Sequence, residues 1–406
     1  MTSGPGSPGT RPAPPATATR GRTRADASPA ADGFGGRAAR GLRLLSGTLG
    51  LGPDVAAAVD DAVPLLFDGW GHRDSRCSDS ADPTARVAPF EYSVVLGGGA
   101  PELRIFLRPL PPAGDTTALG SWEQGRRILA ALERRGFAST GRATALYDLF
   151  RPVDRQASFG LCLAASVRPG GLSGVKVYFD TLAQGRARNR ELVGEALERL
   201  GHGEAWRWLR RNDPASIEVP MPAVFSLDLV ESPAARAKFY TTVTERSAEL
   251  LEERMARLSP AARRRTAALL AALPVAGPQA LAAPGIRPTL CWSLTARCPG
   301  RPEDAALYLP FNHYTPRPEA ASARLAGLLA PESRGLVEAL VTHCAAAPGG
   351  GGADGGGADG GGAAPGGGGA GNPFHWAAAK LARPDRELTL YLSADRVDAA
   401  ARAAHR

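Results

Sequence analysis

The feature of this 406-residue chain that most constrains its fold is a pattern of two helical segments and two strand segments that repeats five times. The helical segments place apolar residues three or four positions apart, and the strand segments alternate. The expected helices are residues 40–51, 55–67, 121–136, 143–150, 188–200, 204–211, 246–258, 260–273, 321–329 and 333–346. The expected strands are residues 90–96, 103–110, 158–167, 174–179, 216–229, 235–243, 289–295, 305–311, 374–381 and 387–392.

This order predicts an α+β fold with ten antiparallel strands closed into a barrel inside ten helices, built from five αα-ββ repeats. A closed barrel leaves no strand edge unpaired, and the helices bury their apolar stripes against it. We expect one barrel domain over residues 41–395, a disordered tail over 1–40 and a C-terminal tail over 396–406. The glycine-rich tract 348–371 is expected to be a flexible loop, because it lacks the Gly-Lys-Ser/Thr motif of a phosphate loop.

Cationic and phenolic side chains alternate along several of the expected strands. Arg236, Lys238 and Tyr240 point to one face of their strand, whereas Ala237 and Phe239 point to the other. In one strand alone, this pattern also fits a solvated sheet edge. Side chains of the same kinds recur at strand spacing in Arg104, Lys176, Tyr178, Tyr308 and Tyr391. In a closed barrel these faces share a lumen, where cations are too costly to bury without a ligand or counter-ion, so an anion site is predicted there.

The composition is that of a globular protein with a basic balance. The net charge is +8 and the sequence pI is about 9.6, which admits nucleic acid, an anionic membrane or a phosphorylated small molecule as partner. No apolar stretch approaches the roughly 20 residues of a membrane span, and residues 1–40 lack the apolar segment of a secretory signal. The five scattered cysteines fit a reducing compartment. We therefore expect a cytoplasmic protein without a membrane partner.

Several of these segments resemble a known enzyme family. The αα-ββ repeat, Glu91 in Pro89-Phe90-Glu91-Tyr92-Ser93, the two cationic strands around Lys176 and Lys238, and the terminal Tyr391-Leu392-Ser393 are similar to aromatic prenyltransferases of the dimethylallyltryptophan synthase type. The resemblance covers roughly residues 42–393. It implies the PT-barrel (ABBA) fold and transfer of a dimethylallyl group from its diphosphate to an aromatic ring, usually an indole. The alanine-, glycine- and arginine-rich composition suggests a bacterial member.

The resemblance also implies a role for each of these residues. Glu91 would accept a hydrogen bond from the indole N–H and, with Lys176, take part in catalysis. The diphosphate would be held by Arg104, Lys176, Arg236 and Lys238, with Tyr178, Tyr240, Tyr308 and Tyr391 closing around the allyl group. Preplaced cations can stabilise charge on the leaving oxygens without a metal ion. We therefore expect no metal and no cofactor, and dimethylallyl diphosphate as a co-substrate.

Two positions depart from the family pattern. The strand before Lys176 offers Ala164 to Arg168 where relatives often carry a lysine, and Ala306 stands two residues before Tyr308 where relatives often carry Lys or Gln. The base that rearomatises the ring and the ring position attacked therefore stay open.

The acceptor and the enzyme class have alternatives as well. The expected partners are a small aromatic acceptor, such as tryptophan or a compound containing it, and the allylic donor, bound by a monomer or homodimer. The open alternatives are a phenolic or naphthalene acceptor, an isoprenoid hydrolase or cyclase, and a basic protein that binds nucleic acid on an open sheet.

Overall fold

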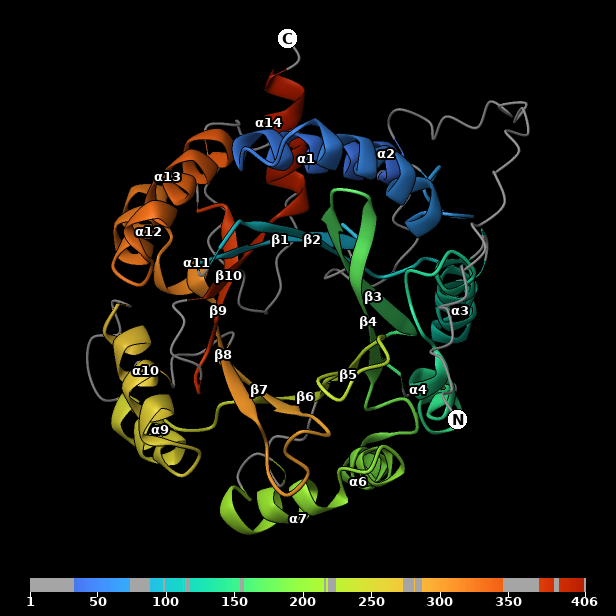
Figure 1. Ribbon diagram of the computed structural model, residues 1–406, viewed down its shortest axis with the longest axis vertical. Helices are drawn as coiled ribbons and strands as arrows, with labels where there is room; N and C mark the ends of the chain where they lie inside the picture. Colours follow the sequence, from blue (N-terminus) through green and yellow to red (C-terminus); the bar gives the residue numbers. More distant parts are fainter. Residues whose placement is uncertain are drawn as a thin grey trace, which may run out of the picture.

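The strands form one closed barrel in the order β1-β10-β9-β8-β7-β6-β5-β4-β3-β2, and each neighbouring pair is antiparallel. The computed structural model describes residues 33–73, 88–97, 99–111, 113, 115, 117–153, 157–214, 217, 224–272, 281, 287–345, 372–382 and 387–404. Viewed down the barrel, the strands make an inner ring and the helices an outer ring (Figure 1). The predicted ten-stranded antiparallel barrel is confirmed.

The strands overlap the segments that the alternation predicts, with shifts at their ends. The largest correction is to the expected strand 216–229, because β5 begins at Val224 and Ile217 is helical. They are β1 (Phe90–Leu96), β2 (Glu102–Leu107), β3 (Leu161–Arg168), β4 (Gly171–Asp180), β5 (Val224–Asp228), β6 (Ala237–Thr242), β7 (Thr289–Leu294), β8 (Asp304–Leu309), β9 (Phe374–Lys380) and β10 (Leu388–Leu392). Each β-hairpin is formed by the two strands of one repeat.

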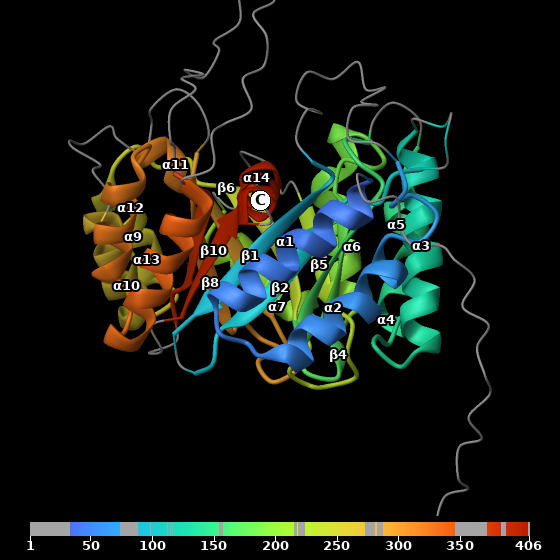
Figure 2. The ribbon, with the colours of Figure 1, turned by 90° about the horizontal axis from the view of Figure 1, so that it is seen from above.

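The helices form pairs outside the barrel. The expected pairs are α1 (Phe34–Thr48) with α2 (Pro53–Leu66), α3 (Ala118–Arg134) with the short α4 (Gly141–Thr144) and α5 (Tyr147–Phe150), α6 (Asn189–Arg199) with α7 (Gly203–Asn212), α9 (Ala248–Ala256) with α10 (Pro260–Ala271), and α12 (Pro318–Ala326) with α13 (Pro331–Ala345). Two further helices are α11 (Phe311–Tyr314) and α14 (Ala394–Ala404). Figure 2 shows α1 and α2 on the outside of the barrel, where α1 contacts β2 and α2 contacts β3 and β4.

The hydrophobic core fills the space between the barrel and the helices. On β6, Ala237 and Phe239 point outward and are fully buried, and Trp206 of α7 packs edge-on against Phe239. Phe150 of α5 stacks on Phe179 of β4 at 4.9 Å between ring centroids. Burying one such side chain stabilises the fold by about 1.5 to 3 kcal/mol. This outward packing fixes the opposite residues of each strand in the lumen.

Two boundaries of the barrel domain are corrected. Helix α1 begins at Phe34, inside the segment 1–40 that was expected to be disordered, and residues 394–404 form α14 where a tail was expected from residue 396. Phe34 packs against Trp70 and Phe90 with ring centroids 6.1 and 6.4 Å apart. These contacts explain why the helix starts before residue 40.

Ion pairs join the two terminal helices. Arg37 of α1 donates to Asp395 at 2.6 Å and to Asp398 at 3.1 Å, and Arg40 donates to Asp398 at 3.0 Å. Because these partners are more than 350 residues apart in the chain, periodicity within either segment does not reveal them. Residues 1–32 and the tract 348–371 lie outside the described residues, so the predictions for them stay predictions. None of the helices that are described combines the length and the apolar character needed to cross a bilayer.

Candidate active site

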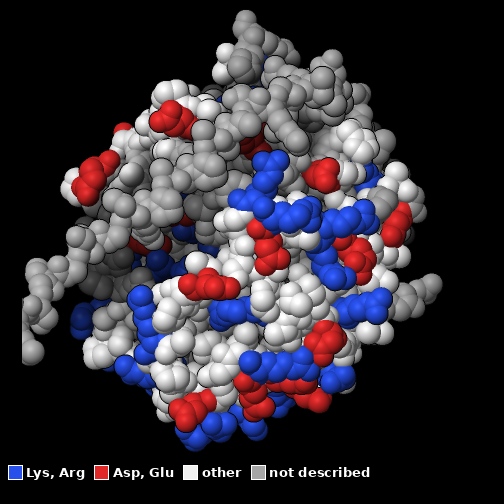
Figure 3. Space-filling model, turned by 45° about the vertical axis from the view of Figure 1, so that its right-hand side comes forward, with Lys and Arg blue, Asp and Glu red and all other residues white. Residues whose placement is uncertain are grey.

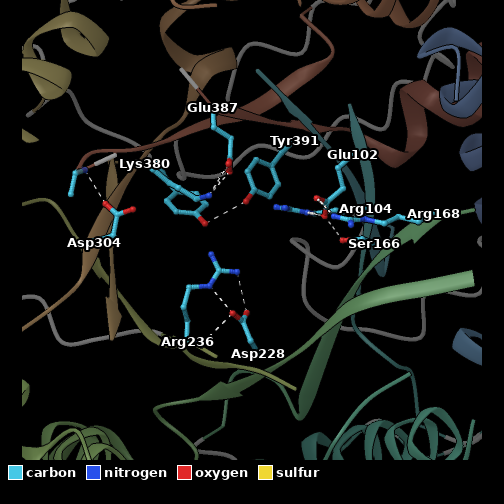
Figure 4. Close-up of polar contacts among 12 residues, drawn as sticks. Glu102, Arg104, Ser166, Arg168, Asp228, Arg236, Asp304, Lys380, Glu387 and Tyr391 are labelled. Atoms are coloured by element: carbon cyan, nitrogen blue, oxygen red, sulfur yellow. Dashed lines mark hydrogen bonds and ion pairs between the residues drawn. The ribbon is translucent and has the colours of Figure 1, made fainter. Parts of the chain in front are cut away.

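A cavity inside the barrel is lined by the inward faces of the strands. All the residues predicted to bind a diphosphate and its allyl group line this one cavity: Arg104, Lys176, Tyr178, Arg236, Lys238, Tyr240, Tyr308 and Tyr391. They come from five different strands, and Figure 4 shows several of them pointing toward a common centre. The prediction that these side chains converge in one lumen is confirmed, whereas their roles remain predictions.

Five aromatic rings form a belt around this lumen. The belt consists of Phe106, Tyr178, Tyr240, Tyr308 and Tyr391, which lie on the second strand of each hairpin. Successive ring centroids are 5.2, 6.3, 5.6 and 5.8 Å apart, and the hydroxyl group of Tyr391 donates to that of Tyr308 at 3.4 Å. Burial raises the pKa of all four tyrosines, which keeps the phenols neutral. The belt therefore supplies neutral π-faces of the kind that stabilise a cation.

The residues two positions before each belt member form a second layer. On β2, β4 and β6 these residues are Arg104, Lys176 and Lys238, whereas on β8 and β10 they are Ala306 and Thr389. The cations of this layer are thus concentrated on one side of the lumen.

Lys380 adds a cation next to the neutral part of this layer. It lies on β9 directly opposite Ala306 in the strand register and lines the same cavity. The structure therefore places a cation close to the position where Ala306 departs from the family pattern.

Three of the lumen cations are paired with carboxylates. Arg236 donates to Asp228 at 2.6 and 3.3 Å, and Lys380 lies 2.7 Å from Glu387. Glu102 accepts from Arg104 at 2.6 Å and also from Ser166 and Arg168 (Figure 4). Glu102 begins β2, Asp228 ends β5 and Glu387 precedes β10, so all three carboxylates lie at the barrel end where the hairpins turn.

Lys176 and Lys238 differ from these three cations. Neither ammonium group forms a hydrogen bond or ion pair with another described residue, although the two side chains are only 8% and 9% exposed. Burial, with the charge of Arg236 as the next cause, lowers the pKa of Lys238 to about 8. Burial, followed by the charges of Arg104 and Lys238, holds the pKa of Lys176 well below its usual value. An anion that enters the lumen would therefore favour the charged form of both lysines.

Glu91 is placed apart from the diphosphate residues. It lies on β1 two positions from Ser93, which lines the cavity, so alternation directs it into the same lumen toward the other end of the barrel. Burial raises the pKa of its carboxyl group to about 8, and its charge acts on the phenol of Tyr391. Glu91 itself is not among the cavity-lining residues.

Sequence reasoning missed four residues that line or shape the site. Phe106 could have been found, because Arg104-Ile105-Phe106 has the spacing of Lys176-Val177-Tyr178. The other three are Lys380, Glu387 and Asp228. No motif marks them, because their partners are set by strand register rather than by spacing along the chain.

Comparison with solved structures identifies the barrel. The prenyltransferase PriB, in a ternary complex with L-tryptophan and dimethylallyl thiolodiphosphate, matches with a TM-score of 0.69 and 26% identity over 90% of this chain and 97% of PriB. This chain is a prenyltransferase with the PT-barrel fold. A second match is the 5-dimethylallyltryptophan synthase from Streptomyces coelicolor, with a TM-score of 0.69 and 25% identity over 90% of this chain and 99% of that enzyme.

A third solved structure shares the fold. The 6-dimethylallyltryptophan synthase from Micromonospora olivasterospora, solved with a donor analogue and tryptophan, has a TM-score of 0.71 and 21% identity over 90% of this prenyltransferase and 98% of that chain. No family model matches the sequence. The predicted resemblance to bacterial prenyltransferases is confirmed.

The nucleic-acid alternative required an open sheet that displays cations and aromatic rings. In this prenyltransferase the sheet is closed, and those side chains point into the lumen. On the outer face shown in Figure 3, acidic and basic residues are interspersed rather than segregated. Within the described segments, no three His, Cys, Asp or Glu side chains gather in a way that could hold a metal ion.

Proposed function

We propose that this prenyltransferase transfers a dimethylallyl group from dimethylallyl diphosphate to the indole ring of tryptophan or of a small molecule that contains tryptophan. The observation that carries the proposal is the pairing of the cation layer with the aromatic belt inside one closed lumen. The donor has the matching two parts, an anionic head and a hydrocarbon that becomes a cation. The solved relatives bound to tryptophan and a donor analogue support the choice of substrates.

The cation layer would act on the leaving group. When the allylic C–O bond breaks, its electron pair stays on the diphosphate oxygen, and negative charge grows there. Arg104, Lys176, Arg236 and Lys238 are already in place to stabilise that charge, without the reorganisation that water would need. We include in the proposal that these side chains do the work of a magnesium ion.

The aromatic belt would act on the allyl cation. Each ring facing the cation is worth about 0.5 to 2 kcal/mol, and the buried belt also keeps water from capturing the cation as an alcohol. Glu91 would accept the indole N–H and offset positive charge as the new C–C bond forms. The ring proton then leaves to a base, which we do not assign, because the strand before Lys176 carries Ala164 to Arg168 where relatives often carry a lysine.

Product analysis tests the proposal. Purified protein is incubated with dimethylallyl diphosphate and EDTA, together with tryptophan, a tryptophan dipeptide, tyrosine or a dihydroxynaphthalene. We expect a prenylated indole product, with the same rate in EDTA as in added magnesium. Prenylation confined to the phenol or naphthalene would contradict the indole assignment. Activity that disappears in EDTA would contradict the metal-independent mechanism, and formation of the alcohol alone would indicate a hydrolase.

A further inference from the structure

Asp228 is a negative charge inside a site that is otherwise built to bind an anion. It ends β5, directly opposite Lys176 of β4 in the strand register. On its other side, its carboxylate receives two bonds from the guanidinium group of Arg236 and one from the Arg236 backbone N–H at 3.3 Å. The carboxylate is therefore bonded to Arg236, which directly precedes β6, and lies next to Lys176 in the strand register.

The charges around Asp228 are coupled. Burial opposes ionisation of Asp228, yet Lys238, Arg236 and Lys176 together hold its pKa well below the usual range. Burial and the neighbouring cations lower the pKa values of Lys176 and Lys238. The negative charge of Asp228 acts in the opposite direction and raises them. Lys176 and Lys238 make no hydrogen bond among the described residues, so Asp228 is the acidic neighbour that counters their burial.

Any site that holds several cations in place for an anion must keep them charged while the anion is absent. Three cations enclosed in one lumen repel one another, and the two lysines among them can respond by losing protons. A diphosphate that arrives at neutral lysines must bind together with protons, which weakens its binding as the pH rises. A fixed carboxylate beside the cations reduces this loss, at the cost of some repulsion toward the diphosphate.

We propose that Asp228 is a positioning residue of the diphosphate site, which holds the Arg236 guanidinium group in place and serves as the counter-ion of Lys176 and Lys238 while no diphosphate is bound. The inference rests on the proposed function, because it takes the cation layer to be the diphosphate site. Other groups also face this cluster and are unchanged in the test below. They are Arg104 on β2, Cys291 on β7, the phenols of Tyr178 and Tyr240, and Arg142 of α4, which contacts the Asp228 backbone oxygen.

The test measures binding of inorganic pyrophosphate by isothermal titration calorimetry between pH 6 and 9. Titration in two buffers of different ionisation enthalpy gives the protons taken up on binding. In Asp228→Asn, we expect the alkaline loss of affinity to begin about one pH unit or more lower than in wild type. Proton uptake at pH 8 should rise in that variant. At pH 6, where protonation of the lysines is more favourable than at pH 8, Asp228→Asn should bind pyrophosphate at least as tightly as wild type.

Three further variants separate this role from a structural one. Arg236→Gln removes a positive neighbour of the lysines, so pyrophosphate binding should persist to higher pH than in wild type. This shift is opposite to that of Asp228→Asn, and the overall affinity should fall. Asp228→Glu should restore the wild-type pH limit. Glu102→Gln, which changes a lumen carboxylate paired with arginines, should leave the pH limit unchanged. Arg236→Gln keeps the test decisive if Asp228→Asn does not fold.

Two results would overturn the proposal in distinguishable ways. If wild type binds pyrophosphate but Asp228→Asn shows the same pH limit and the same proton uptake, the role of Asp228 is wrong and the proposed function stands. If wild type fails to bind pyrophosphate at any pH, the diphosphate site itself is wrong, and this inference fails with it.

Discussion

The two sides of the lumen share one aromatic pattern and differ in charge. β2, β4 and β6 carry Arg104, Lys176 and Lys238 two positions before the belt, whereas β8 and β10 carry Ala306 and Thr389. Every repeat therefore places a ring at the same height, but three repeats supply the cation layer. A nearly symmetric barrel thus presents an asymmetric surface. We expect the diphosphate on the cationic side and the hydrocarbon parts of both substrates toward the neutral side.

The largest effect is expected from removing a cation on the charged side. Lys238→Ala or Arg236→Ala should lower kcat/KM for dimethylallyl diphosphate by two to three orders of magnitude, since loss of one preorganised donor costs about 2.7 to 4 kcal/mol. Thr389→Ala, at the corresponding position on β10, is the matched control and should change the rate less than threefold. Steady-state kinetics with circular dichroism of each variant measures this. Full activity in the lysine variant would remove the case for a diphosphate site.

The next effect concerns the acceptor. Above pH 8, where the carboxyl group is ionised, Glu91→Gln should reduce prenylation of tryptophan by about 10- to 100-fold, because a hydrogen bond to a charged group contributes about 1.5 to 3 kcal/mol. A dihydroxynaphthalene, which has no indole N–H, should be affected much less. Relative rates on the two acceptors, with Ser93→Ala as the neighbouring control on β1, give the comparison. Equal losses on both acceptors would contradict a specific contact with the indole.

A smaller effect is expected from the cation on the neutral side. Lys380→Met should raise the KM for the donor by about tenfold, which corresponds to the loss of one hydrogen bond to a charged group. The effect should be smaller than that of Lys238→Ala, because Lys380 is already paired with Glu387. If Lys380→Met were more damaging than Lys238→Ala, the diphosphate would lie against β8 and β9, and the contrast between the two sides would be reversed.

A still smaller effect is expected within the belt, where ring and hydroxyl can be separated. Tyr308→Phe keeps the ring and should lower kcat by only a few fold, whereas Tyr308→Leu should release more dimethylallyl alcohol, since about 0.5 to 2 kcal/mol of cation stabilisation is lost. The ratio of alcohol to prenylated product measures this. An unchanged ratio in the leucine variant would mean that Tyr308 does not face the cation.

A separate effect is on stability. Burial raises the pKa of Glu91 to about 8 from an ordinary value of 4.5, so the carboxyl group resists ionisation in the folded protein. Wild type should lose stability relative to Glu91→Gln as the pH rises from about 4.5 to 8, and the difference in stability should become independent of pH below about pH 4. Denaturant unfolding at several pH values measures it. A wild type that gains stability over this range would mean that Glu91 is ionised and paired.

The sequence predicted what depends on alternation and repetition. Each of the ten strands could be assigned, and with them the inward direction of Lys176, Lys238 and Tyr240, because side-chain direction in a strand has period two. Contacts that depend on strand register, or on residues far apart in the chain, could not be predicted. Arg236 and Asp228 bond across the turn of a hairpin, and Lys380 of β9 lies opposite Ala306 of the neighbouring strand β8. Ion pairs join α14 to α1. None of these partners has a signal at a fixed spacing.

The most direct test of the central claim is a crystal structure of this prenyltransferase with dimethylallyl thiolodiphosphate. We expect diphosphate oxygens within hydrogen-bond distance of Lys176, Arg236 and Lys238, with the allyl chain against the rings of Tyr240 and Tyr308. A diphosphate bound outside the barrel, or in the lumen against Ala306 and Thr389 with Lys176 and Lys238 left without contact, would contradict it.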